Sequence, residues 1–106
     1  MKVAVFIKNN ELTSLYETDI HVVIFNIVNN KVMGVENFIL EKQNKDSILR
    51  WLNHKSIDKV YISGIENGTI QKLELNNIQV KTYEMLKDDK LFNSLALTSH
   101  QLRKTS

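Results

Sequence analysis

The chain contains no cysteine, no proline and only three glycines in 106 residues. Without cysteine it forms no disulfide, uses no thiolate nucleophile and holds no iron–sulfur cluster through thiolates of its own. No apolar run approaches the roughly 20 residues that a membrane-spanning helix needs. The net charge is only +2, with lysine and glutamate interleaved, which is not typical of a nucleic-acid-binding surface. We therefore expect a cytoplasmic protein with neither a membrane nor a nucleic acid as its partner.

What the chain does contain suits one folded domain. Hydrophobic residues make up 42% and charged residues 25% of it, which is ordinary for a globular chain. A length of 106 residues is enough for a single core and too short for two. We expect one domain over residues 1–106, with residues 98–106, which include Arg103 and Lys104, as a fraying or disordered end.

Three apolar runs in the first part of the chain predict strands at residues 2–7, 21–28 and 31–40. The second run is apolar enough to be buried on both faces. Asn29 and Asn30 separate the second run from the third. Because asparagine tolerates positive φ, this pair predicts a tight hairpin between antiparallel neighbours.

After residue 40 the pattern alternates between helix and strand. Ile48, Leu49 and Leu52 have the spacing of one helix face, and Asp46 or Ser47 is the expected N-cap. Residues 58–64 and 78–83 predict strands.

Two further helices complete the pattern. Residues 69–77 predict a helix with Ile70 and Leu73 on its buried face and a left-handed cap at Asn76 and Asn77. Asp88 and Asp89 favour the start of a helix that continues to residue 104. The order β-β-β-α-β-α-β-α predicts the α/β class, a mixed sheet of about five strands flanked by helices. Since strand–helix–strand crossovers join parallel strands, we expect the last three strands to be parallel neighbours.

Two irregular segments are the candidate ligand site. They are residues 11–19 and the stretch "SGIENGT", residues 63–69, and both follow strands that we expect to be parallel. Ligands of such sheets bind at the carboxyl ends of the strands. No lysine follows Gly68, as a phosphate-binding loop requires, so the stretch is better interpreted as a turn from strand to helix whose glycines allow close approach of the backbone.

The other chemistry-bearing residues do not form a known motif. His21, His54 and His100 are not at metal-ligand spacing, and His21 is the one expected nearest to a functional loop. The first predicted strand, "KVAVFIK", has no carboxylate to hold magnesium, which disfavours a metal-dependent hydrolase of the ribonuclease H kind.

Three stretches of the chain together resemble a known family. They are "MKVAVF" at the start, "VVIFNIVNNKVMGVEN" at the hairpin and "IDKVYISGIENGTIQKLELNNIQVKTY" in the second half. The pattern over residues 1–97 is similar to the dinitrogenase iron–molybdenum cofactor biosynthesis family, the NifX-like proteins and the C-terminal domain of NifB. The resemblance implies a mixed five-stranded sheet similar to the ribonuclease H motif. It also implies binding of an iron–sulfur or iron–molybdenum cluster precursor.

The chain departs from this family at both of its motifs. Where family members have "HFGRA", this chain has "LYETD", so Leu15 takes the place of the histidine and Thr18 that of the arginine. Where they have a glycine followed by "GPG", it has Ser63 and the triplet "ENG" at residues 66–68. The more acidic first loop disfavours an anionic metal cluster.

We therefore expect a non-enzymatic module that binds a small molecule or a protein at a diverged site. The alternatives are a metallocluster carrier that uses His21 and carboxylates, and the metal-dependent hydrolase. The residues expected at the ligand site are Leu15, Tyr16, Glu17, Thr18, Asp19, Ser63, Gly64, Glu66, Asn67 and Gly68.

Overall fold

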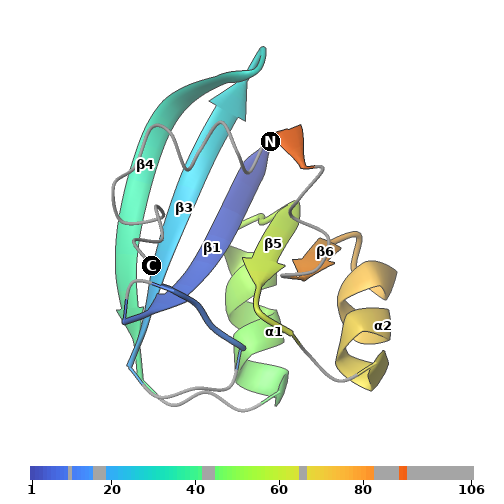
Figure 1. Cartoon of the computed structure of the whole chain (residues 1–106). Coiled ribbons are helices and arrows are strands. Elements are labelled where there is room, and N and C mark those ends of the chain that lie inside the picture. Colours follow the sequence, from blue (N-terminus) through green and yellow to red (C-terminus); the bar gives the residue numbers. More distant parts are fainter. Residues whose placement is uncertain (10, 16–18, 42–44, 65–66, 83–88, 91–106) are drawn as a thin grey trace.

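The computed structural model describes residues 1–9, 11–15, 19–41, 45–64, 67–82 and 89–90 (Figure 1). In chain order the elements are β1 (Lys2–Lys8), β2 (Glu11–Leu12), β3 (Ile20–Val28), β4 (Lys31–Leu40), α1 (Lys45–His54), β5 (Lys59–Ile62), α2 (Asn67–Leu75) and β6 (Gln79–Thr82). The predicted α/β class, with a mixed sheet flanked by helices, is confirmed. The helix predicted over residues 88–104 lies almost entirely outside the described residues.

The strands form a sheet in the order β4-β3-β1-β5-β6, and β2 pairs with β1 as a sixth strand. β1 is antiparallel to β3 and parallel to β5, and β5 is parallel to β6. The expectation that β4 and β5 are neighbours is wrong, because β3 and β1 lie between them. The reason is the composition of β1, whose buried residues Val3–Ile7 need cover on both faces and a partner on both edges.

A two-residue turn joins β3 to β4, as predicted. Val28 pairs with Lys31, and the residues between them, Asn29 and Asn30, have φ angles of 53° and 62°. Positive φ at both positions defines a type I′ turn, whose twist matches that of the paired strands. The register then shifts between Asn26 and Ile27, where a β-bulge interrupts the ladder.

Both helices end in the same hydrogen-bonded motif. In α1 the Ile57 amide donates to the Leu52 carbonyl at 3.1 Å, and the Ser56 amide donates to the Asn53 carbonyl at 3.0 Å. In α2 the amides of Ile78 and Asn77 donate in the same pattern to the carbonyls of Leu73 and Glu74, each at 3.0 Å. This is the Schellman motif, which places one residue in the left-handed conformation.

The left-handed residues of these two motifs are Ser56, with φ 57°, and Asn77, with φ 61°. The predicted cap at Asn77 is confirmed. At the other end of α1 the predicted N-cap is wrong, since the helix already begins at Lys45 and therefore includes Asp46 and Ser47. Lysine is a good helix former, so the helix takes in Lys45 and begins before both of the predicted caps.

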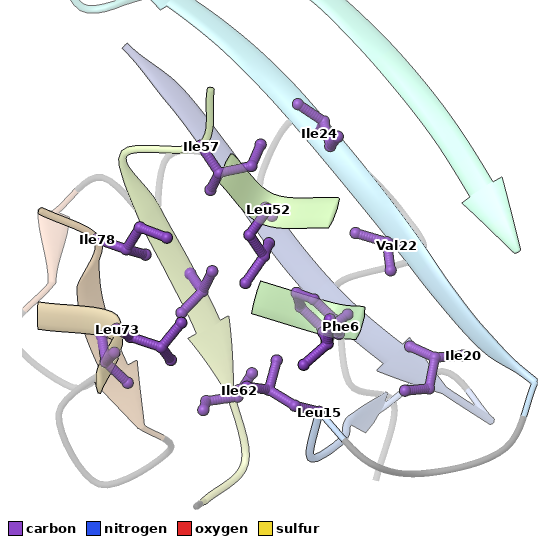
Figure 2. Close-up of a cluster of buried hydrophobic side chains, with 14 residues drawn as sticks. Phe6, Leu15, Ile20, Val22, Ile24, Leu52, Ile57, Ile62, Leu73 and Ile78 are labelled. Carbon is purple, nitrogen blue, oxygen red and sulfur yellow. The ribbon is translucent and has the colours of Figure 1, made fainter. Parts of the chain in front are cut away.

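The core has two parts, one on each face of the sheet. Alternate residues of β1 separate between them: Ala4 and Phe6 belong to the cluster that α1 and α2 cover, which Figure 2 shows, and Val3, Val5 and Ile7 belong to the second cluster. β3 divides in the same way, so its predicted burial on both faces is confirmed. Within α1, Ile48 and Leu52 are buried, and Leu49 and Trp51 pack against them.

Tyr61 is the one polar-tipped side chain of the second cluster. It is fully buried, and its hydroxyl donates a 2.9 Å hydrogen bond to a carboxylate oxygen of Asp89. Burial raises the pKa of Tyr61 far above its usual range, and the hydrogen bond and negative charge of Asp89 raise it further. The tyrosine therefore stays a neutral hydrogen-bond donor.

Candidate functional site

The two irregular segments that the sequence singled out lie at the same end of the sheet. β1 and β5 run in the same direction, with Val5 opposite Tyr61, so their carboxyl ends share an edge. The Thr13 amide donates to the Phe6 carbonyl at 2.9 Å, and the Thr13 carbonyl accepts from the Ser63 amide at 3.1 Å. Thr13 therefore joins the end of β1 to the end of β5 and brings the two segments together.

Leu15 lies in the core beneath this junction. Its side chain is 0% exposed and belongs to the same cluster as Phe6, Ile20 and Ile62 (Figure 2). It anchors the first segment, and its side chain is not exposed at the loop surface. This placement follows from its chemistry, since burying a leucine side chain is worth about 1.5–3 kcal/mol relative to leaving it in water.

Asp19 lies at the same end of the sheet, on the surface. His21, two residues later, pairs with Ile7 near the end of β1, which fixes the position of Asp19 in the fold. Asp19 is exposed and has a φ of 53°, a left-handed conformation that aspartate tolerates better than most residues. Among the predicted site residues, Tyr16, Glu17, Thr18, Glu66 and the side chain of Asn67 lie outside the described part of the chain.

The sequence suggested that Gly64 and Gly68 allow close approach of the backbone, and the structure gives a different reason for them. Neither has a positive φ. A Cβ added to either would meet no heavy atom of the described residues within 4 Å. The turn therefore requires neither conformational freedom nor close backbone approach at these positions, and the glycines instead leave open space beside the backbone.

That open space lies at the start of α2. Gly68 is exposed, Gly64 is half-buried, and the first turn of α2 carries no acidic residue. The first amides of a helix lack partners within the helix, and the helix dipole places partial positive charge there. The arrangement can therefore donate hydrogen bonds to a carbonyl, carboxylate or phosphate oxygen.

Sequence reasoning missed two threonines at this end of the fold. Besides Tyr61, the buried side chains with a polar group among the residues that the structure describes are Thr13 and Thr69. Thr13 follows β2, and Thr69 lies in the first turn of α2. The signal available in the sequence was a threonine within each of the two predicted segments, next to an apolar residue, Leu12 or Ile70.

His21 faces away from the helices. It alternates with Val23 and Phe25, which belong to the second cluster, and its Nε2 lies 2.9 Å from Oδ1 of Asn37 on β4. His54 ends α1, and His100 lies outside the described residues. Across the described part of the chain, no three histidine or carboxylate side chains gather as metal ligands would.

These residues do not fit the metal cluster that the family resemblance implies. The chain has no cysteine, and the position of the family's histidine is occupied by a fully buried leucine, Leu15. A cluster would therefore find neither thiolate nor imidazole ligands at the described part of this junction.

The fold and the junction define an α/β domain with a mixed sheet in which the carboxyl ends of the neighbouring strands β1 and β5 lie side by side. No family model matches the chain, and no curated protein matches it. Among solved structures, the crystal structure of PH0822 is similar, with a TM-score of 0.63 and 17% sequence identity over 77% of this chain and 76% of that one. At this identity the likeness establishes the fold alone. Neither described helix is long and apolar enough to cross a bilayer.

Proposed function

We propose that this chain is a non-enzymatic binding module whose ligand sits at the junction of residues 13–15 and 63–69. The observation that carries the proposal is the hydrogen bond from the Ser63 amide to the Thr13 carbonyl, 3.1 Å long, beside two glycines that the fold does not require. Glycine weakens a helix by roughly 0.5–1 kcal/mol relative to alanine. A glycine in the first turn of α2 that serves neither a turn nor a close contact is explained if the open space is used by a ligand.

The chemistry of the junction favours a small molecule with a hydrogen-bond-accepting group. The donors are the backbone amides of Gly64 and Gly68, the two positions without a side chain to cover them. Ser63 is exposed and adds a hydroxyl, and Asp19 is an exposed carboxylate that disfavours a highly charged anion. A carbonyl or a single carboxylate of a metabolite or peptide therefore suits the junction better than a polyphosphate.

A binding role is also supported by the composition of β1. Residues Val3–Ile7 are apolar and buried, so this strand supplies none of the carboxylates that a hydrolase of the ribonuclease H kind places there to hold magnesium.

We further propose that the module is a divergent member of the dinitrogenase iron–molybdenum cofactor biosynthesis family. The motifs over residues 1–97 and the mixed sheet support this, and the replacement of the family's ligands supports a different cargo.

The test is amide NMR of the isotope-labelled protein with a panel of carboxylate metabolites, nucleotides and inorganic phosphate. We expect shifts that saturate and are confined to the amides of Thr13, Ser63, Gly64, Gly68 and their neighbours. Gly64→Val fills the open space and is expected to abolish these shifts. Gly34→Ala is the matched control, because a Cβ there would stand 3.8 Å from Cβ of Asn26, an ordinary contact far from the junction.

Two results would contradict this proposal. Shifts that survive in Gly64→Val would place the ligand elsewhere. Anaerobic incubation with an iron–sulfur cluster donor, giving visible absorption that stays with the protein through gel filtration, would favour the metallocluster carrier instead.

A further inference from the structure

The outer edge of β4 is the longest strand edge that the described sheet leaves open. β4 spans ten residues and is the first strand in the sheet order, so β3 pairs with one of its edges and no described strand pairs with the other. Natural proteins protect such edges with prolines, lysines or bulges. Here the bulge lies near Asn26 and Ile27, opposite the start of β4, and leaves the part from Gly34 to Leu40 regular.

Exposed apolar side chains concentrate on this strand. Met33 is 65% exposed, Val35 51% and Ile39 77%. Val35 and Ile39 pair with Phe25 and His21 of β3, so both lie on the sheet face opposite α1. Such a strand favours pairing with another strand.

We propose that two copies of this chain pair through the outer edges of β4, antiparallel, with Asn37 of each copy on the two-fold axis. In this register Val35 of one copy stands opposite Ile39 of its partner, and the reverse pair forms on the other side of the axis. Directly opposed residues in an antiparallel pair have their Cβ atoms about 4.5–5.5 Å apart, so these exposed side chains cover each other. The two Asn37 side chains, between the apolar pairs, can hydrogen-bond as amides.

The face toward α1 supplies charge complementarity in the same register. Glu36 stands opposite Phe38 of the partner copy, and both positions lie on the face of Ile24 and Val22. Within one copy, the Nζ of Lys55 lies 4.4 Å from the centroid of the Phe38 ring. The carboxylate of Glu36 therefore approaches Lys55 of the partner copy. Because the dimer is two-fold symmetric, it contains two such ion pairs.

Two registers with the axis closer to the start of β4 fit less well. An axis at Glu36 places two carboxylates directly opposite each other, which is destabilising. An axis at Val35 requires residues 31–34 to join the ladder, where the bulge interrupts the regular strand. The axis at Asn37 uses only the regular part of β4, and because it is a two-fold axis the assembly closes at two copies.

The first test is sedimentation velocity of the full chain from low micromolar to near-millimolar concentration. We expect a monomer–dimer equilibrium that Ile39→Lys weakens at least tenfold. Leu75→Lys, at an 82% exposed apolar position on α2, is the control and is expected to dimerise as the unsubstituted protein does. A monomer at every concentration, open-ended association, or equal loss in both variants would overturn the proposal.

The second test fixes the register by exchanging charges. Glu36→Lys and Lys55→Glu are each expected to weaken the dimer by roughly 2- to 30-fold, and the double variant to restore it. Circular dichroism and thermal unfolding of each variant separate loss of pairing from loss of fold. Failure of the double variant to restore the dimer, with the fold intact, would overturn the register around Asn37.

Discussion

Replacing Ser56 with glycine is expected to make the protein more stable. Ser56 occupies the left-handed position that ends α1, with a φ of 57°, and its side chain is exposed. Glycine is the preferred residue in this position of a Schellman motif because it has no Cβ to clash with the backbone carbonyl. The described part of the chain uses no glycine at any of its left-handed positions.

The size of the effect follows from two opposing contributions. Holding a residue with a Cβ in the left-handed conformation costs about 1–2 kcal/mol. Glycine loses more backbone freedom on folding, which offsets about 0.5–1 kcal/mol of that gain. Taking the middle of each range, the net increase in the free energy of unfolding is about 0.75 kcal/mol, or about 3–6 °C in Tm for a domain of this size.

Urea denaturation measures this difference directly. With a slope of about 1–3 kcal/mol per molar urea, the midpoint of Ser56→Gly is expected to rise by about 0.2–1 M. Ser56→Ala keeps the Cβ and is expected to be no more stable than the unsubstituted protein. An unchanged or lower midpoint in Ser56→Gly, or an equal rise in Ser56→Ala, would refute the explanation in terms of backbone conformation.

Three further changes test other parts of the fold. Leu15→Ala is expected to lower the free energy of unfolding by about 2–5 kcal/mol, because the side chain is fully buried, whereas Leu75→Ala, at an exposed position, should change the urea midpoint little. Above about pH 10 an unfolded tyrosine loses the proton that folded Tyr61 keeps, so the stability of the protein falls as the pH rises. Tyr61→Phe removes this contribution, and the loss of stability between about pH 9 and about pH 11 should be smaller in that variant. Asn30→Gly is expected to raise Tm, because an Asn-Gly pair suits a type I′ turn best; an unchanged Tm would contradict the turn assignment.

Local patterns in the sequence predicted much of this fold. The pair Asn29 and Asn30 predicted the hairpin, and the apolar spacing of Ile48 and Leu52 predicted the buried face of α1. Each of these depends on residues close together in the chain. The position of β5 beside β1 is different, because Val3 and its partner Lys59 lie in distant parts of the sequence and no local period relates them.

The location of the candidate site in the fold could be predicted from the sequence, but the burial and role of its individual residues could not. The topology brings the two segments together, as expected. However, the segments' side chains divide between core and surface: Leu15 is buried and Ser63 is exposed. Sequence pattern also could not distinguish a glycine that a turn requires from one, such as Gly64, beside open space.

The central place of β1 has a consequence for the protein while it is being synthesised. β1, β3 and β4 can assemble once Leu40 has emerged, because these strands pair only with one another on that side of the sheet. The other edge of β1 pairs with β5, and this pairing cannot be complete until Ile62, the last residue of β5, has been synthesised. At about 5–20 residues per second, that interval lasts about 1–4 s. During it Val3–Val5, the buried part of β1 that pairs with β5, presents an unpaired edge, so the nascent chain is most prone to mispairing at the strand that later holds the finished sheet together.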